Sequence, residues 1–213
     1  MGASDSRIVS YGWRITHITP CSPAASAGLV PYFDFLIRLN DVLLSNDRDE
    51  VVHQIQSQSG TSLVLAVLNA KLGTIRECTV VLSDTPESGR DLLGLVIAYC
   101  DVDIDSFHPV RVLDVFPERP ASQAGLQAFN DYLFGTSTLI FTSLHDLEET
   151  MKNATKPVPI MSYNSQTSAI RVVIVPVIDK WTDLTSMGCD LASGAEHGIP
   201  LDDRPVRFDA PLS

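Results

Sequence analysis

Histidine is the side chain best suited to acid–base catalysis at neutral pH, and this sequence has five: His17, His53, His108, His145 and His197. Nucleophilic catalysis also needs a serine or cysteine on a rigid turn within hydrogen-bond reach of such a base. No Gly-x-Ser-x-Gly motif, phosphate-binding loop or dinucleotide fingerprint is present. The sequence therefore predicts a protein that is not an enzyme and that has no cofactor.

The cysteines are the next candidates for chemistry, and they are sparse: Cys21, Cys78, Cys100 and Cys189. No two of them have the close spacing of a zinc knuckle or a redox motif. Four cysteines in 213 residues do not make a disulfide framework, and free thiols suit a reducing compartment. We expect no metal site and a cytosolic setting.

Gly2 is a candidate for lipidation. The segment Met1–Ser6 has a glycine at the second position and a serine at the sixth, which is the pattern for N-myristoylation. One myristoyl chain gives only marginal membrane affinity, and no polybasic segment is present to add to it. A membrane-bound form would need a second anchor, from a partner or from oligomerisation. The alternative is that this six-residue match arose by chance.

Charge and composition limit the function classes. The chain has 15 Lys and Arg against 26 Asp and Glu, a net charge of −11. This balance argues against a nucleic-acid partner, since phosphate binding needs a basic face. With 45% hydrophobic and 19% charged residues the chain can build a core. The longest apolar runs, such as Leu63–Leu68, are far shorter than the roughly 20 residues of a membrane span, and no signal segment opens the chain. We expect a soluble globular protein.

The chain contains an internal repeat. Residues 23–29 recur as residues 120–126, and Asp34-Phe35-Leu36 recurs as Asp131-Tyr132-Leu133, both at a lag of 97 residues. A fixed lag of this length indicates two homologous domains in tandem. We place the boundary between Asp101 and His108. The organisation predicted is an N-terminal segment (1–7), two domains (8–104 and 105–200) and a C-terminal tail (201–213).

Each copy has the same pattern of short elements. Alternating residues from Arg14 to Thr19 predict a half-buried strand. Ser22 and Pro23 predict the N-cap and first position of a short helix, which Gly28 ends. Other predicted elements of the first copy are strands at 35–39, 42–44, 63–68, 75–82 and 92–99 and a helix at 49–56; those of the second are 110–115, 122–125, 131–134, 144–151, 158–163 and 170–175. The pattern predicts α+β domains, each a partly open antiparallel barrel with two helices. This layout resembles PDZ domains of the permuted, bacterial type.

PDZ-like domains bind extended peptides by adding a strand to a sheet edge beside a helix. The corresponding edge is Leu93-Gly94-Leu95-Val96-Ile97, facing a helix whose apolar residues include Val52 and Ile55. Gly94 would let backbone amides converge on a terminal carboxylate. The competing interpretation is that the leucines and the isoleucine fill the core. In the second copy, Met187-Gly188-Cys189 precedes Asp190, which would repel a carboxylate. We expect that groove to serve an internal loop or packing instead.

The two copies of Ser/Arg-Pro-Ala-x-x-Ala-Gly-Leu, the Gly2 start and the tandem arrangement resemble the N-terminal domain of the Golgi reassembly stacking protein (GRASP) family. Residues 31–35, Leu92-Leu93-Gly94, Asp131-Tyr132, Trp181 and 187–189 also match, so the resemblance spans about residues 8–200. Family members usually have a histidine where Arg14 and Arg111 stand, which weakens any metal site between that position and Cys100.

The resemblance implies a myristoylated peripheral protein on the cytosolic face of Golgi membranes. Such proteins tether membranes by forming homo-oligomers, and they bind golgin C-termini or internal peptides in their PDZ grooves. The alternative function is a soluble tandem-PDZ scaffold that binds C-terminal peptides with no membrane anchor. Membrane partition and acylation distinguish the two.

Overall fold

The computed structural model describes residues 10–82, 92–102 and 108–209. The first domain contains, in chain order, β1 (Tyr11–Ile18), α1 (Pro23–Ser26), β2 (Asp34–Leu39), β3 (Val42–Leu43), α2 (Arg48–Gln56), β4 (Ser62–Asn69), β5 (Thr74–Val81) and β6 (Leu95–Asp101). Its antiparallel sheet has the order β5-β4-β2-β1-β6, and β3 pairs with β2. The strand that ends the domain, β6, is therefore an edge of this sheet.

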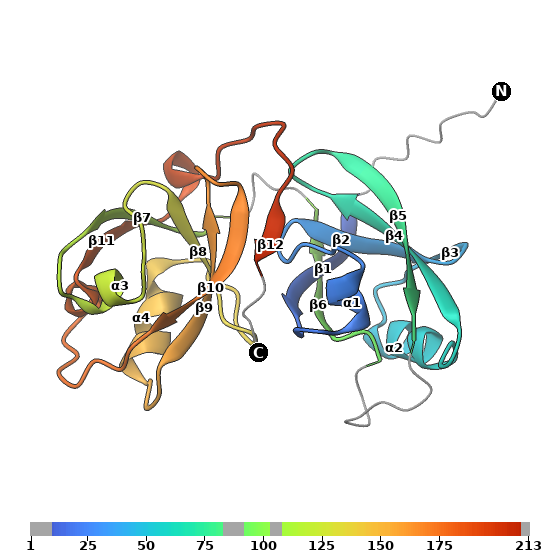
Figure 1. The fold of residues 1–213 in the computed structure, drawn as a ribbon, viewed down its shortest axis with the longest axis horizontal. Coiled ribbons are helices and arrows are strands. Elements are labelled where there is room, and N and C mark those ends of the chain that lie inside the picture. Colours follow the sequence, from blue (N-terminus) through green and yellow to red (C-terminus); the bar gives the residue numbers. More distant parts are fainter. Residues whose placement is uncertain (1–9, 83–91, 103–107, 210–213) are drawn as a thin grey trace.

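The second domain repeats this order (Figure 1). Its elements are β7 (Val110–Val115), α3 (Pro120–Gln123), β8 (Asp131–Gly135), α4 (Leu144–Lys152), β9 (Val158–Asn164), β10 (Ala169–Val175), η1 (Leu184–Met187), β11 (Cys189–Ala192), η2 (Ala195–His197) and β12 (Arg207–Asp209). The sheet order is β11-β7-β8-β9-β10-β12, antiparallel except for the parallel pair β10 and β12. Two open, mostly antiparallel sheets with few helices agree with the predicted α+β class.

The short helix α1 forms as the sequence predicted. Ser22 is its N-cap, and the Ser22 side chain accepts a hydrogen bond from the Ala25 N–H. Pro23 occupies the first turn, where its missing N–H costs nothing. Gly28 follows the C-cap with φ of +67°, a left-handed conformation that glycine adopts without steric penalty.

The strand predicted at Arg14–Thr19 forms as β1, but the prediction that it is half-buried was wrong, because β1 is covered on both faces. Arg14 is only 6% exposed, and its guanidinium lies 5.0 Å from the centroid of the Phe35 ring. Thr16 is buried as well. Burial lowers the pKa of Arg14, and the ring face below it favours the cation. The polar residues Arg14 and Thr16 of this alternating pattern are therefore buried and do not face solvent.

A buried carboxylate links three strands at the equivalent place in both domains. Asp34 accepts hydrogen bonds from Asn69 Nδ2 at 2.8 Å and from both terminal nitrogens of Arg76 at 3.0 and 2.5 Å. The equivalent set in the second domain is Asp131, Asn164 and Arg171, with distances of 2.7, 3.0 and 2.7 Å. Charge-assisted, bidentate bonds of this kind offset the cost of burying the carboxylate.

The two domains share a third hydrophobic core, rich in aromatic residues. Tyr32 and Phe33 of the first domain pack on Phe134 of the second, with ring centroids 4.7 and 5.7 Å apart, and Phe33 lies 5.1 Å from Tyr163. All four rings are at most 2% exposed. This burial makes the domain junction a packed interface.

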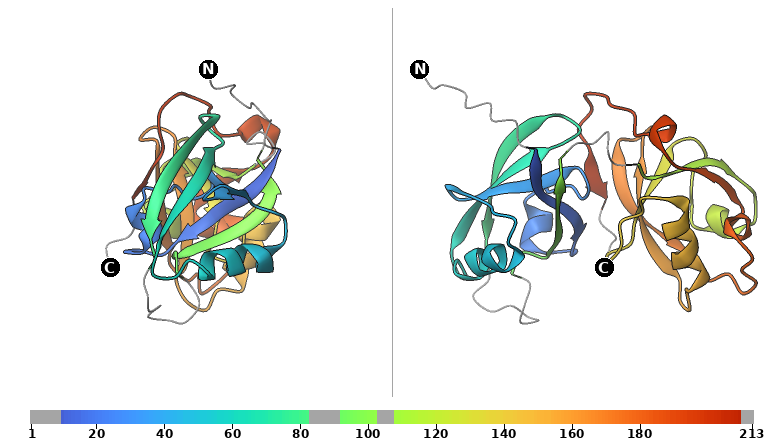
Figure 2. Two further views of the ribbon diagram at one scale, coloured as in Figure 1. Left: turned by 90° about the vertical axis from the view of Figure 1, so that its right-hand side faces the viewer. Right: turned by 180° about the vertical axis from the view of Figure 1, so that it is seen from behind.

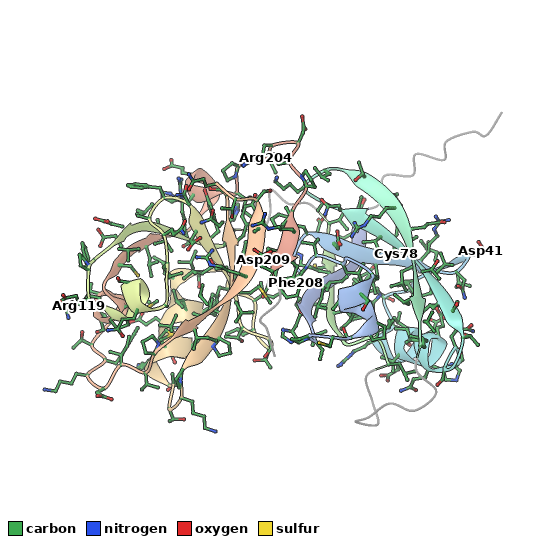
Figure 3. The ribbon with its side chains drawn as sticks, in the orientation of Figure 1. Asp41, Cys78, Arg119, Arg204, Phe208 and Asp209 are labelled. Atoms are coloured by element: carbon green, nitrogen blue, oxygen red, sulfur yellow. The ribbon has the colours of Figure 1, made fainter. Side chains whose placement is uncertain are left out.

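The segment predicted as a C-terminal tail takes part in this junction. Val206 is buried in the shared core, and Phe208 packs against both that core and the core of the first domain. β12 lies between β10 and the first domain in Figure 1 and in the rear view of Figure 2. Figure 3 shows Arg204, Phe208 and Asp209 at the same junction. Lys71 of the first domain, whose side chain is fully buried, donates to Asp202 at 2.5 Å and to the Arg204 carbonyl at 2.8 Å.

Candidate functional site

A cavity of about 230 Å³ lies between the edge strand β6 and the helix α2. Its lining is mostly apolar and comes from β2, α2, β6 and the residues before β6. The lining residues are Leu36, Arg48, Val52, Ile55, Gln56, Leu92, Leu93, Leu95, Val96 and Ile97. We call this cavity the first groove. The structure thus brings together Leu93, Leu95, Val96, Ile97, Val52 and Ile55, which the sequence placed in one candidate site.

The lining residues of β6 and the turn before it differ in burial. Leu93 is 3% exposed and belongs to the core of the first domain, so it forms the floor of the groove. Leu95 and Ile97 are partly buried and pack against that core from the groove side. Val96 is 41% exposed. Leu93 therefore fits the core interpretation, while Leu95, Val96 and Ile97 are accessible from the groove.

Gly94 lies at the start of β6 and is constrained by its neighbours. Its φ is +73°, and a Cβ built there would lie 2.2 Å from Cβ of Ser22. Its carbonyl accepts from the Thr19 N–H at 2.9 Å, and the Leu93 carbonyl accepts from the Ala24 N–H at 3.0 Å. The turn before β6 is thus held against the N-terminus of α1. Close packing on Ser22 is a reason for glycine here that the sequence did not indicate.

The direction of α2 along the groove follows from one hydrogen bond and the groove lining. Trp13 pairs with Tyr99 of β6, and its indole N–H donates to the Ser45 carbonyl at 2.8 Å, just before α2 begins. The N-terminus of α2 is therefore near Tyr99. The residues of β6 that line the groove with α2 all precede Tyr99 in the chain, so α2 runs from the Tyr99 end toward the Leu95 end, antiparallel to β6.

The second domain has a different arrangement at the equivalent place. Met187 is 0% and Cys189 4% exposed, and both belong to the core of that domain. Gly188 has φ of +71° and packs against Arg119, the N-cap residue of α3, as Gly94 packs against Ser22. Burial, together with the nearby Asp190 carboxylate, raises the pKa of the Cys189 thiol to about 12. The three residues predicted for a second groove thus lie in the interior or in a tight turn.

The two helices beside the strands also carry different side chains. α2 and α4 are both nine residues long, and their second turns begin with the buried residues Val51 and Leu147. By this alignment Glu148 stands where Val52 lines the first groove. On the strand, Asp190 stands where Val96 does, and it pairs with Asp114 of β7. The second copy is therefore more acidic along this face.

The sequence analysis missed four lining residues: Leu36, Arg48, Gln56 and Leu92. Arg48, Val52, Ile55 and Gln56 lie at positions i, i+4, i+7 and i+8, which share one helix face. That spacing was a usable signal, but only apolar residues of the helix were taken as groove candidates, so Arg48 and Gln56 were not predicted.

Two observations bear on the metal site considered between Arg14 and Cys100. Within the ranges that the structure describes, no group of three or more His, Cys, Asp or Glu could hold a metal ion. Burial raises the pKa of the Cys100 thiol, although the nearby Arg14 lowers it in part. An arginine beside this thiol cannot act as a metal ligand.

Two further features bear on membrane association. Gly2, the predicted lipidation site, lies outside the described residues. Among the helices that the structure describes, none has the length and apolarity to cross a membrane.

Comparison with known proteins gives matches along almost the whole chain. Residues 3–85 and 71–202 each match the GRASP55/65 PDZ-like domain family. The chain is 33% identical over 201 residues to Golgi reassembly-stacking protein 1 of Mus musculus and 32% identical over 189 residues to that of Homo sapiens. An uncharacterised protein of Schizosaccharomyces pombe is 25% identical over 194 residues. The matches cover 94%, 89% and 90% of this chain but 45%, 43% and 54% of those proteins. The chain thus spans about half the length of its relatives.

Proposed function

Since the chain belongs to the GRASP55/65 PDZ-like family, we propose that it is a non-enzymatic adaptor of Golgi membranes that binds extended peptides in the first groove. The observation that carries the proposal is the apolar groove between an edge strand and a helix, lined by six of the seven residues predicted from sequence. The relatives with this domain are named Golgi reassembly-stacking proteins, which supports the proposed association with Golgi membranes.

Recognition would proceed by strand addition to β6. An extended segment pairs with the outer edge of β6, and alternate side chains face the groove. In the antiparallel orientation its carboxyl terminus lies at the Gly94 end, and its terminal side chain lies between Leu95 and Ile55. Burying one Val or Leu side chain there contributes about 1.5–3 kcal/mol. Golgin-type C-termini are the ligands that the family resemblance suggests, and an internal peptide that reaches the groove as a hairpin is the second possibility.

The second domain is proposed to have a different role. Its strand carries Asp190 and its helix carries Glu148 at the positions that line the first groove. Two carboxylates there oppose a terminal carboxylate by charge repulsion. We assign Met187, Gly188 and Cys189 to packing, and we assign C-terminal peptide binding to the first groove.

Membrane attachment is proposed to combine Gly2 acylation with self-association. One myristoyl chain holds a monomer only marginally. Two or more linked copies multiply that affinity, and copies on opposite membranes would link the membranes. The net charge of −11 makes electrostatic attraction to anionic lipid an unsuitable second anchor.

Peptide binding is tested by fluorescence anisotropy of the full chain with labelled peptides that end in an apolar residue. We expect Val52→Glu to reduce affinity at least tenfold, because it places a carboxylate in the groove. Val42→Glu is the matched control, since Val42 is exposed on β3 and does not line the groove. Equal affinities for the two variants would rule out this groove as the binding site.

Membrane attachment is tested in cells with a C-terminal tag on the native chain and on Gly2→Ala. We expect the native chain on Golgi membranes and the variant dispersed, with Ala3→Ser as a control that keeps Gly2. If both are diffuse, the Gly2 match is accidental and the alternative function, a soluble tandem-PDZ scaffold, is correct. If both stay on Golgi membranes, a partner recruits the protein. Light scattering over a concentration series tests self-association, and a constant monomer mass would contradict it.

A further inference from the structure

Arg48 is the one charged side chain among the described residues that line the first groove. It is exposed on the first turn of α2, with Val52, Ile55 and Gln56 along the same helix face. An apolar groove in an acidic protein thus presents a single positive charge to whatever binds there.

The position of Arg48 has no structural explanation. A cation at the first helical residue opposes the helix macrodipole, whose N-terminal end is positive. No hydrogen bond or ion pair links its guanidinium to another side chain within the part of the chain that the structure describes. Leu144, the first residue of α4, packs against the core of its own domain. At this helix position the second domain has an apolar side chain packed on its core, whereas the first domain has the charged Arg48 at the groove.

Neighbouring carboxylates do not cancel this charge at the groove. Asp47 is the N-cap and accepts from the Asp49 and Glu50 N–H groups, and Glu50 accepts from the Ser45 hydroxyl at 2.6 Å. Asp49 and Glu50 lie about 100° and 200° around the helix from Arg48. Glu50 therefore faces away from the groove, and Asp49 lies beside Gln56 at its edge, while Arg48 lies on the same helix face as Val52 and Ile55.

We propose that Arg48 selects peptides with an acidic side chain, so that the first groove reads an apolar carboxyl terminus and a nearby Glu or Asp together. This specificity rests on the proposed function. Arg48 is seven residues before Ile55, about 10 Å along the helix toward the Tyr99 end of the groove. A bound strand rises about 3.4 Å per residue, so this distance spans about three residues. Only alternate residues face the groove, which puts the acidic side chain two or four residues before the terminal one.

The test uses fluorescein-labelled heptapeptides with a free carboxyl terminus, SGSTEVL and SGETSVL, against SGSTQVL, SGQTSVL and SGSETVL. In the first two the acid is two or four residues before the terminal leucine, and in the last it is three before it and faces away from the groove. Affinities are measured by anisotropy on the full chain and on Arg48→Gln, Arg48→Glu and Arg38→Gln. Arg38 is the control, since it pairs with Glu77 of the opposite edge strand β5.

We expect at least one groove-facing Glu peptide to bind about fivefold tighter than its Gln partner, the upper range for a partly exposed ion pair. The preference should disappear in Arg48→Gln, reverse in Arg48→Glu, weaken with added salt and persist in Arg38→Gln. If all peptides bind the native chain equally well, the inference about Arg48 is wrong and the proposed groove stands. If no peptide binds and Val52→Glu changes nothing, the proposed function itself fails. Unchanged thermal unfolding of each variant excludes misfolding as the cause.

Discussion

The turn before β6 offers a quantitative test of the packing that shapes the first groove. Gly94 and Gly28 both have a left-handed backbone, with φ of +73° and +67°. They differ in the space around them. A Cβ at Gly28 meets nothing within 4 Å, whereas a Cβ at Gly94 lies 2.2 Å from Cβ and 2.5 Å from Oγ of Ser22. Gly28→Ala thus isolates the backbone strain, and Gly94→Ala adds a steric clash to it.

The expected magnitudes follow from these distances. An L-residue in the left-handed region costs about 1–2 kcal/mol. Overpacking adds about 1–3 kcal/mol when the neighbour cannot move aside. Ser22 is held by its capping bond to Ala25, and the chain beside it by the bond from Ala24 to Leu93. We therefore expect Gly28→Ala to lower the free energy of unfolding by about 1 kcal/mol and Gly94→Ala by about 3 kcal/mol.

The assay is urea unfolding followed by tryptophan fluorescence in a Trp181→Phe background, so that Trp13, buried in the first domain, is the probe. Ser22→Gly removes the clashing side chain and costs only a few tenths of a kcal/mol by itself, because glycine is tolerated at an N-cap. We expect Ser22→Gly to recover most of the clash energy in the Gly94→Ala protein. Equal costs for the two glycine variants, or no recovery in the double variant, would refute the assigned packing.

Three further predictions concern buried and charged groups elsewhere. Asp131→Ala should lower the free energy of unfolding by about 3–5 kcal/mol, because its arginine partner loses a buried counter-charge; urea unfolding measures this. With its pKa raised to about 12, the Cys189 thiol should resist a disulfide reagent at pH 8 in the folded protein, whereas exposed Cys21 should react at once. Hydrogen bonds from Arg204, and then from a buried lysine, hold the pKa of Asp202 well below its usual range. The ionised Asp202 therefore stabilises the fold fully above about pH 4, and this stabilisation is lost as the pH falls toward the lowered pKa. Urea unfolding midpoints measured from pH 6 to pH 2 should therefore fall less steeply for Asp202→Asn than for the native chain.

Domain membership has consequences for how these proteins are compared. The chain belongs to the GRASP55/65 PDZ-like family over nearly its whole length but spans about half of its mammalian relatives. The first groove and the aromatic residues of the shared core lie within the matched residues 3–202, and β12 follows them.

Local sequence signals were enough to predict the elements that depend on neighbouring residues. The repeat at a lag of 97 residues indicated two copies, and the Ser22, Pro23 and Gly28 signals placed α1 correctly. The helix expected at 49–56 is α2, and the strand expected at 110–115 is β7. Caps, turns and periodicity act within a few residues of the chain, so a single sequence contains all the information that they need.

Which faces meet became known from the folded chain. It covered Arg14 with Phe35, joined Tyr32 and Phe33 to Phe134, and paired β12 with β10, although the sequence had suggested a half-buried strand and a tail. It also turned Arg48 toward the same groove as Val52. These contacts join residues far apart in the chain, and their free energy comes from excluding water between surfaces. An alternating or helical pattern shows that a face is apolar, but not what covers it.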